Sequence, residues 1–165
     1  MTTIYVDGDA CPVREEVFRV ATRLNHLPVI VVANGSRPIR PPDLPNVTMQ
    51  IVAEGPDAAD DWIAERILRG DVCVTSDIPL AARCLEKAAR ALNPKGHHWT
   101  LDNIGTALAG RAVGEHLRAT GIPTGGPAAM QKQDRSRFLE ALDAAVQAAL
   151  RDAAAPPPRK WVSFE

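Results

Sequence analysis

The stretch Ile4-Tyr5-Val6-Asp7-Gly8-Asp9 lies near the start of the chain and places two acids directly after a short apolar run. Such a run, followed by turn-forming residues, predicts a β-strand over about residues 3–6 that ends in an acidic turn. Ligands of open α/β sheets bind beyond the carboxyl ends of the strands, so Asp7 and Asp9 are candidate functional residues. Crowded carboxylates either bind a hard cation or raise one another's pKa. The structural alternative is that Asp9 only caps the following helix.

The rest of the chain alternates between two kinds of apolar pattern. Continuous apolar runs predict strands at about residues 28–33, 47–53, 72–75 and 98–101, and helical spacing predicts helices at about residues 13–25, 57–70, 79–91, 103–117 and 134–151. Strands that alternate with helices are typical of a parallel sheet covered on both faces. We therefore expect a single-domain, three-layer α/β/α fold with a mainly parallel sheet of about five strands. The domain spans residues 1–152, and residues 153–165 form a proline-rich C-terminal tail.

The composition indicates an ordinary globular protein. The 165 residues are 45% apolar and carry a formal net charge of −1, so bulk charge does not attract the chain to nucleic acid or to a membrane. The three cysteines have no C-x-x-C spacing, which argues against a disulfide framework and a structural zinc site. We recognise no signal segment and no apolar run of membrane-spanning length. These features predict a cytoplasmic protein with no membrane association.

Acidic residues recur at the ends of other predicted elements. Asp57 and Asp60 begin a helix and, being three residues apart, share one of its faces. Asp77 follows the fourth predicted strand as Asp7 follows the first, and the two carboxylates face one crevice if those strands are neighbours. Each of these acids also has a structural alternative, since aspartate at a helix start serves as a cap. For Asp102, capping is the favoured interpretation.

Clustered carboxylates of this kind suit Mg²⁺ or Mn²⁺, which take oxygen ligands and keep several waters. The histidines show no zinc-binding pattern, because His97 and His98 are adjacent and would face opposite sides of a strand. Cys11 lies near a helix start, which favours a reactive thiolate. The nearby acids oppose that effect and no partner base is evident, so we expect a small buried core residue instead.

The segment Asp7-Gly8-Asp9-Ala10-Cys11-Pro12-Val13 resembles the D-x-D-A-C-P signature of the bacterial YaiI/YqxD family, whose function is unknown. Gly8 stands where the signature more often has alanine. The resemblance extends to about residue 145 and includes DAAD at residues 57–60, VTSDIPLA at 74–81, NPKG at 93–96, TGGP at 124–127, and Asp134-Arg135 with Phe138.

This family is similar in fold to the PIN-like nucleases, whose clustered acids bind Mg²⁺ or Mn²⁺. In that wider group one acid follows the first strand and another lies in a T-x-D element, which correspond here to Asp7 and to Thr75-Ser76-Asp77. The resemblance implies that Asp7 and Asp77 are catalytic. It also implies, by looser correspondence, that the metal ligands are Asp7, Asp9, Asp57, Asp60 and Asp77.

A basic, glycine-containing segment covers residues 111–137. Adjacent glycines leave backbone N–H groups accessible to anions. The candidates for contacting substrate phosphates are therefore Arg118, Gly125, Gly126 and Arg135. The alternative is a solvated loop and helix face, and the near absence of aromatic residues argues against base stacking.

These observations together predict a divalent-metal-dependent nuclease or phosphodiesterase that acts on RNA or another phosphodiester. One alternative is a non-catalytic module of PIN-like fold that binds nucleic acid or protein. A second is a phosphatase of the haloacid-dehalogenase kind, with Asp7 as its nucleophile. Against the phosphatase, Gly70-Asp71 lies on the wrong side of its strand for the late acidic motif of that class.

Overall fold

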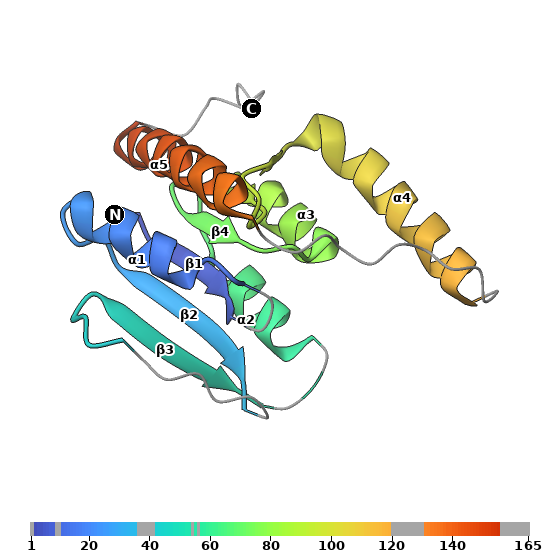
Figure 1. Cartoon of the computed structure of the whole chain (residues 1–165), viewed down its shortest axis with the longest axis horizontal. Helices are drawn as coiled ribbons and strands as arrows, with labels where there is room; N and C mark the ends of the chain where they lie inside the picture. Colours follow the sequence, from blue (N-terminus) through green and yellow to red (C-terminus); the bar gives the residue numbers. More distant parts are fainter. Residues whose placement is uncertain are drawn as a thin grey trace, which may run out of the picture.

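A sheet of six strands runs through the described part of the chain, in the order β3-β2-β1-β4-β5-β6 (Figure 1). The computed structural model describes residues 2–8, 11–35, 42–53, 55, 57–119 and 131–155, and for residues 111–119 it describes the backbone alone. The strands are β1 (Ile4–Asp7), β2 (Val29–Asn34), β3 (Val47–Val52), β4 (Val72–Val74), β5 (Arg90–Leu92) and β6 (His98–Trp99). The helices are α1 (Arg14–Arg23), α2 (Ala58–Arg66), α3 (Ile78–Glu86), α4 (Leu101–Ala119) and α5 (Lys132–Ala154). This arrangement confirms the predicted three-layer α/β/α fold with a mainly parallel sheet.

The strand β1 lies between β2 and β4 and pairs with both in parallel, with Val6 opposite Val31 on one side and Val74 on the other. The chain builds outward from β1 through β2 to β3 and then returns to the other side of β1 as β4. The strand order therefore reverses between β1 and β4, which is where open α/β sheets bind ligands. The condition under which Asp7 and Asp77 face one crevice, that the first and fourth predicted strands are neighbours, is met.

The predicted number of strands was one too low. The helix expected over residues 79–91 ends at Glu86, and Arg90–Leu92 forms β5 beside β4. The alanines at 88, 89 and 91 favour a helix by intrinsic propensity, but Ala88 has a φ of 61° that turns the chain out of α3. Ala91 and Leu92 are then buried in the sheet, so tertiary packing overrides the local preference. The last strand, β6, is short and antiparallel to β5.

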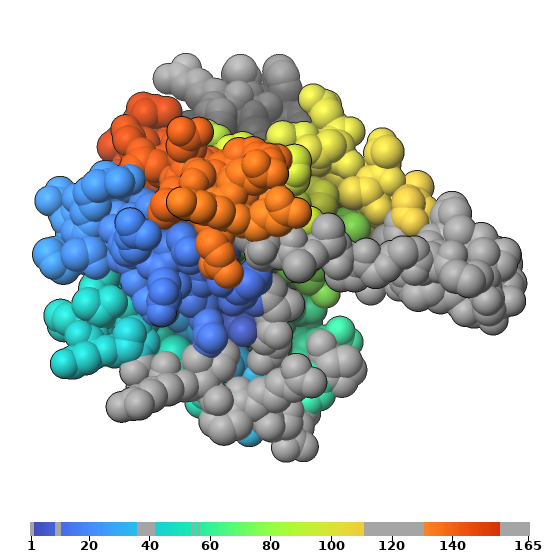
Figure 2. All heavy atoms as spheres, in the orientation of Figure 1, coloured from blue at the N-terminus to red at the C-terminus, as the bar shows by residue number. Residues whose placement is uncertain are grey.

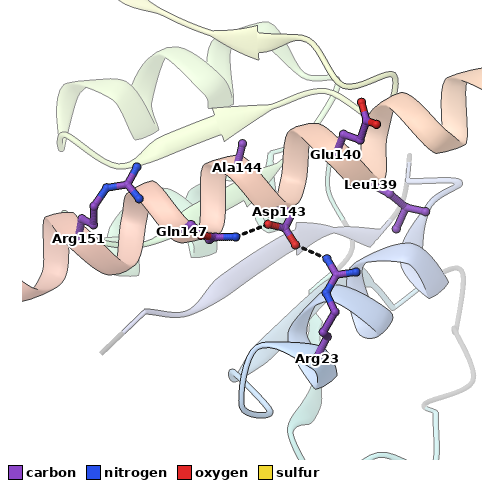
Figure 3. A pocket seen from close by; sticks show the side chains of 7 residues that line it. All are labelled: Arg23, Leu139, Glu140, Asp143, Ala144, Gln147 and Arg151. Atoms are coloured by element: carbon purple, nitrogen blue, oxygen red, sulfur yellow. Dashed lines mark hydrogen bonds and ion pairs between the residues drawn. The ribbon is translucent and has the colours of Figure 1, made fainter.

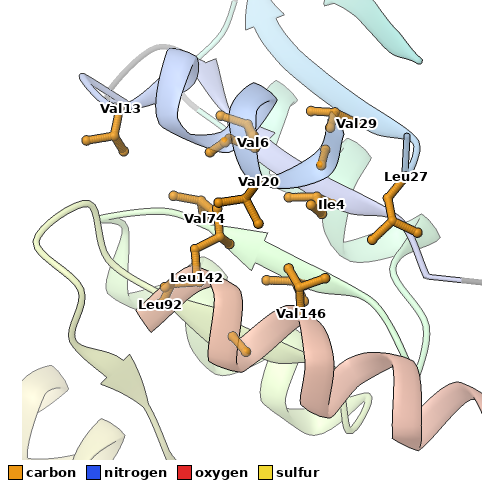
Figure 4. Packing of buried hydrophobic residues seen from close by; sticks show 14 of the residues in the cluster. Ile4, Val6, Val13, Val20, Leu27, Val29, Val74, Leu92, Leu142 and Val146 are labelled. Carbon is orange, nitrogen blue, oxygen red and sulfur yellow. The ribbon is translucent and has the colours of Figure 1, made fainter. Parts of the chain in front are cut away.

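Two apolar cores lie on opposite faces of the sheet because successive residues of a strand point to opposite faces. Ile4 and Val6 of β1 face the core that α1 and α5 cover, whereas Tyr5 faces the core beneath α2 and α3. Figure 4 shows Val20 from α1 meeting Val146 and other side chains of α5 over the first of these faces. The space-filling view shows α1 and α5 in contact along the surface (Figure 2). Burial of the apolar helix faces thus fixes both layers.

The helix α4 begins earlier than predicted and projects away from the three layers (Figure 1). Its start is capped by Thr100 and Asn103, since each side chain bonds the main-chain N–H of the other. The interpretation of Asp102 as the cap is therefore wrong, because the helix starts one residue before it. No helix in the described ranges is long and apolar enough to cross a membrane.

Two glycines let loops approach α5 closely. At Gly96, with φ of 90°, a Cβ would lie 3.0 Å from the main chain of Arg137. At Gly70, with φ of 95°, a Cβ would lie 2.9 Å from Cβ of Ala153. Residues 153–154 of the predicted tail are thus helical and packed, while residues 156–165 lie outside the described residues. Both glycines are needed for their conformation and for the space they leave.

Candidate functional site

The hydroxyl of Thr75 connects the carboxyl ends of β1 and β4. Asp7, the last residue of β1, is 7% exposed, and its Oδ2 accepts a hydrogen bond from Oγ1 of Thr75 at 3.1 Å. The same Oγ1 accepts the main-chain N–H of Asp77 at 2.9 Å. Trp99 donates its indole N–H to the carbonyl of Thr75 at 3.3 Å, which holds β6 against this turn. The T-x-D element therefore orients Asp7 and Asp77 toward the same edge of the sheet.

Asp77 is also the N-cap of α3. Its Oδ1 accepts the main-chain N–H of Leu80 at 2.9 Å, so the capping alternative raised by the sequence is correct. This bond uses one carboxylate oxygen, and the Asp77 carboxyl also hydrogen-bonds that of Asp60. Capping and participation in an acidic cluster are therefore compatible at this residue.

The first turn of α2 brings the other two predicted acids to the site. Asp57 occupies the N-cap position of α2, but its side chain makes no capping hydrogen bond. The interpretation of Asp57 and Asp60 as a capping pair is therefore wrong. The carboxyl of Asp60 instead hydrogen-bonds that of Asp77. Its place in the first turn of α2 still gives it some stabilisation from the helix dipole.

Burial raises the pKa of Asp60 to about 7. The negative charges of Asp77, Asp7 and Asp57 and a hydrogen bond with Asp77 act in the same direction. Arg83, the nearby cation of α3, pairs with Asp61 at 2.7 Å. Below neutral pH a proton on Asp60 relieves the repulsion within the cluster, and a divalent cation would relieve it in the same way.

Of the five predicted metal ligands, Asp7, Asp57 and Asp77 lie near enough to Asp60 for their charges to raise its pKa. Asp9 lies outside the described residues. Within the described ranges, no three acidic, histidine or cysteine side chains form a group that could hold a metal ion. A divalent ion at this site would have to complete its coordination with water or a substrate, as Mg²⁺ commonly does.

Among the four predicted phosphate-contacting residues, Arg135 is the one whose side chain lies in the described part of the structure. Arg135, on the first turn of α5, bonds the carbonyl of Pro12 at 3.0 Å and pairs with Glu16 at 3.2 Å, beside the turn that follows β1. Gly125 and Gly126 lie outside the described residues, as does the side chain of Arg118. The helix α5 begins before Asp134: Gln131 is its N-cap, and Asp134 completes a capping box with it.

Cys11 is a core residue. It is 7% exposed, and burial raises the pKa of its thiol to about 11, helped by the charge of Asp7. The thiol is therefore protonated at neutral pH, which confirms the expectation of a buried cysteine and removes the basis for a nucleophile.

A shallow cavity of about 540 Å³ lies between α1 and α5 at the opposite end of α1 (Figure 3). Three of its polar side chains are paired with one another, since Asp143 accepts hydrogen bonds from both Arg23 and Gln147. The acids after β1 and β4, which lie where the strand order reverses, are the stronger candidate for chemistry.

The raised pKa of Asp60 predicts a dependence of stability on pH. Its ordinary value is 3.8, so between about pH 4 and pH 7 the folded protein keeps a proton that the unfolded chain has lost. The free energy of unfolding should therefore fall as the pH rises across this window. Asp60→Asn should remove much of that fall, whereas Asp61→Asn, which changes the exposed neighbour, should not. Urea unfolding at several pH values measures the free energy of unfolding of the wild type and the two variants. An equal dependence of that free energy on pH in all three proteins would contradict the raised pKa of Asp60.

Comparison with known proteins identifies the family of this chain. Residues 5–148 match the family described as "Uncharacterized BCR, YaiI/YqxD family". A UPF0178 protein of Rhodopseudomonas palustris is 52% identical over 94% of this chain and 97% of its own length. Another, of Paramagnetospirillum magneticum, is 55% identical over 92% of this chain and 98% of its own length. No solved structure gives a significant match. The chain belongs to the YaiI/YqxD family.

Proposed function

We propose that this protein is a divalent-metal-dependent phosphodiesterase, and most specifically a nuclease. The observation that carries the proposal is the convergence of Asp7, Asp60 and Asp77 at the point where the strand order reverses. A structural role alone would not favour such an arrangement, because crowded carboxyls destabilise a fold unless a proton or a cation compensates them. Functional sites are where strongly shifted pKa values concentrate.

The chemistry of the donor set fits Mg²⁺ or Mn²⁺. Carboxylate oxygens are the ligands that these hard cations prefer, and few carboxylates are needed because several waters remain bound. Asp7 and Asp77 would hold the ion, with Asp60 and Asp57 contributing directly or through water; Asp9, two residues after Asp7 in the sequence, is a further candidate ligand. When bound, such an ion polarises a phosphate oxygen and lowers the pKa of water.

The side chains of the site have distinct roles in this proposal. Thr75 fixes the orientation of the Asp7 carboxylate through its 3.1 Å hydrogen bond. Asp60, with a pKa of about 7, can accept or release a proton at neutral pH. Arg135 lies on the neighbouring turn, where its positive charge would attract a phosphate of the substrate backbone. Binding, orientation and proton transfer are therefore available within one edge of the sheet.

The test is a calorimetric titration of Mn²⁺ into the wild type and into the double variant Asp7→Asn, Asp77→Asn. We expect the wild type to bind Mn²⁺ and the double variant to bind it at least about tenfold more weakly, since both central ligands lose their charge. Asp61→Asn is the matched control, because Asp61 lies next to the cluster and pairs outward with Arg83. Equal and negligible affinity in all three proteins would overturn the proposal.

An assay of labelled RNA with and without a chelator separates the nuclease from the non-catalytic module. Cleavage that needs Mn²⁺ supports the nuclease, whereas RNA binding that a chelator does not change, without cleavage, would favour the non-catalytic module. A separate experiment tests the phosphatase, which a phosphoryl group trapped covalently on Asp7 would favour.

A further inference from the structure

A cavity of about 400 Å³ opens at the first turn of α1, next to the acidic cluster. It is lined by Cys11, Pro12, Arg14, Glu15, Glu16 and Arg135. Its position follows from the topology, because α1 begins a few residues after Asp7, and the charge of Asp7 acts on the thiol of Cys11 in the cavity wall. A ligand in this cavity would therefore be a near neighbour of a group bound at the acids.

Two buried atoms of this cavity lack hydrogen-bond partners. One is Nη1 of Arg14, a donor, and the other is Oε2 of Glu16, an acceptor. Glu16 is 8% exposed, and its other oxygen accepts a hydrogen bond from Nη1 of Arg135 at 3.2 Å. Buried polar groups in folded proteins are nearly always satisfied, so this pair indicates a missing partner. Residues two apart in a helix do not face each other, which explains why they do not satisfy one another.

The two unsatisfied atoms define the chemistry of that partner. A guanidinium N–H seeks an anionic oxygen, and arginine is suited above all to phosphate. A carboxylate oxygen can only accept, so the partner must also present a donor such as a hydroxyl. The N-terminus of α1 and the guanidinium of Arg135 add positive potential on the same wall. Glu15 also lines the cavity, but its side chain is exposed, so solvent screens its opposing negative charge.

We infer that this cavity binds a ribonucleotide unit of the substrate, with Arg14 donating to a phosphate oxygen and Glu16 accepting from the 2′-hydroxyl. The 2′-hydroxyl is the group by which proteins distinguish RNA from DNA at a given position. The inference rests on the proposed function for the role of the neighbouring acids. It extends that function by assigning RNA as the substrate and by naming the two residues that select it.

The experiment measures binding in the presence of a chelator, so that the result is independent of metal and of cleavage. Fluorescence anisotropy compares three labelled pentanucleotides of one sequence that carry 2′-hydroxyl, 2′-fluoro or 2′-hydrogen sugars. The 2′-fluoro sugar keeps an RNA-like shape but cannot donate a hydrogen bond. We expect the wild type to bind the ribonucleotide about tenfold more tightly than the 2′-fluoro probe, as the loss of one charge-assisted hydrogen bond implies.

Variants of Glu16 and Arg14 test which residue produces the preference for the 2′-hydroxyl probe over the 2′-fluoro probe. Glu16→Gln keeps an oxygen for Arg135 but loses the charged acceptor, and it should bring the ratio between the two probes close to one. Arg14→Gln should weaken all three probes alike, whereas Arg19→Gln, on the exposed side of the same helix, should leave both the affinities and the ratio unchanged. Thermal unfolding checks that each variant is folded, and Arg14→Lys serves if Arg14→Gln is not.

Equal affinity of the wild type for the 2′-hydroxyl and 2′-fluoro probes would overturn the inference without the need for any variant. It would mean that Glu16 does not accept a hydrogen bond from the 2′-hydroxyl. The Mn²⁺ titration of the wild type separates this result from the proposed function. If the wild type prefers the ribonucleotide probe but does not bind Mn²⁺, the nuclease proposal alone is overturned; if it binds Mn²⁺ without that preference, this inference alone is overturned.

Discussion

Replacing Asp7 by asparagine is expected to lower the rate of Mn²⁺-dependent phosphodiester hydrolysis at least about a hundredfold, which corresponds to about 2.7 kcal/mol of lost transition-state stabilisation. Asparagine keeps an oxygen that can accept the hydroxyl of Thr75, so the turn between β1 and β4 should persist. It removes the negative charge of the carboxylate that is 7% exposed at the centre of the proposed site. Initial rates at saturating Mn²⁺, with circular dichroism to confirm the fold, measure the effect.

The same substitution should shift the pH dependence of any residual activity. The charge of Asp7 is one of the causes that raise the pKa of Asp60, so its removal should let Asp60 lose its proton at lower pH. Asp61→Asn is the control, with an expected rate close to that of the wild type. Full activity in Asp7→Asn would show that the acids at this edge do not carry the reaction.

Phe138→Ala is expected to reduce the free energy of unfolding by about 3–5 kcal/mol, the usual cost of emptying a buried aromatic site. Phe138 lies on α5 and is 0% exposed within the core that α1 and α5 share with the sheet. Its backbone also lies against Gly96, so the loop between β5 and β6 packs on the same turn of α5. Neighbouring segments therefore have little freedom to close the cavity that the substitution leaves.

Urea unfolding of Phe138→Ala and of a control on the same helix tests this prediction. Leu150 is 36% exposed, so Leu150→Ala should cost about 1 kcal/mol or less. A loss below about 1 kcal/mol in Phe138→Ala would mean that α5 contributes little to the core. That result would also weaken the proposal that Arg135 contacts a substrate phosphate, because α5 holds this arginine beside the turn after β1.

Local patterns predicted most elements of this fold because continuous apolar runs and helical spacing record which faces are buried. The five strands expected from the sequence are all present, at shifted boundaries. The sixth, β5, was missed, because Ala91 and the alanines before it carry no strand preference. Caps were predicted less well. Asp77 caps α3 as one interpretation held. Asp57 occupies the N-cap position of α2 but makes no capping hydrogen bond, and Asp102 lies inside α4, which begins one residue before it.

The sequence by itself determined the order of strands and helices and the placement of Asp7 and Asp77 at strand ends. Only the tertiary structure decided that β1 and β4 are neighbours, since pairing depends on how the whole sheet is wound. The raised pKa of Asp60 and the unsatisfied atoms of Arg14 and Glu16 likewise arise from groups distant in sequence or from burial. A carboxyl's charge and partners are properties of its surroundings, and those surroundings exist only once the chain has folded.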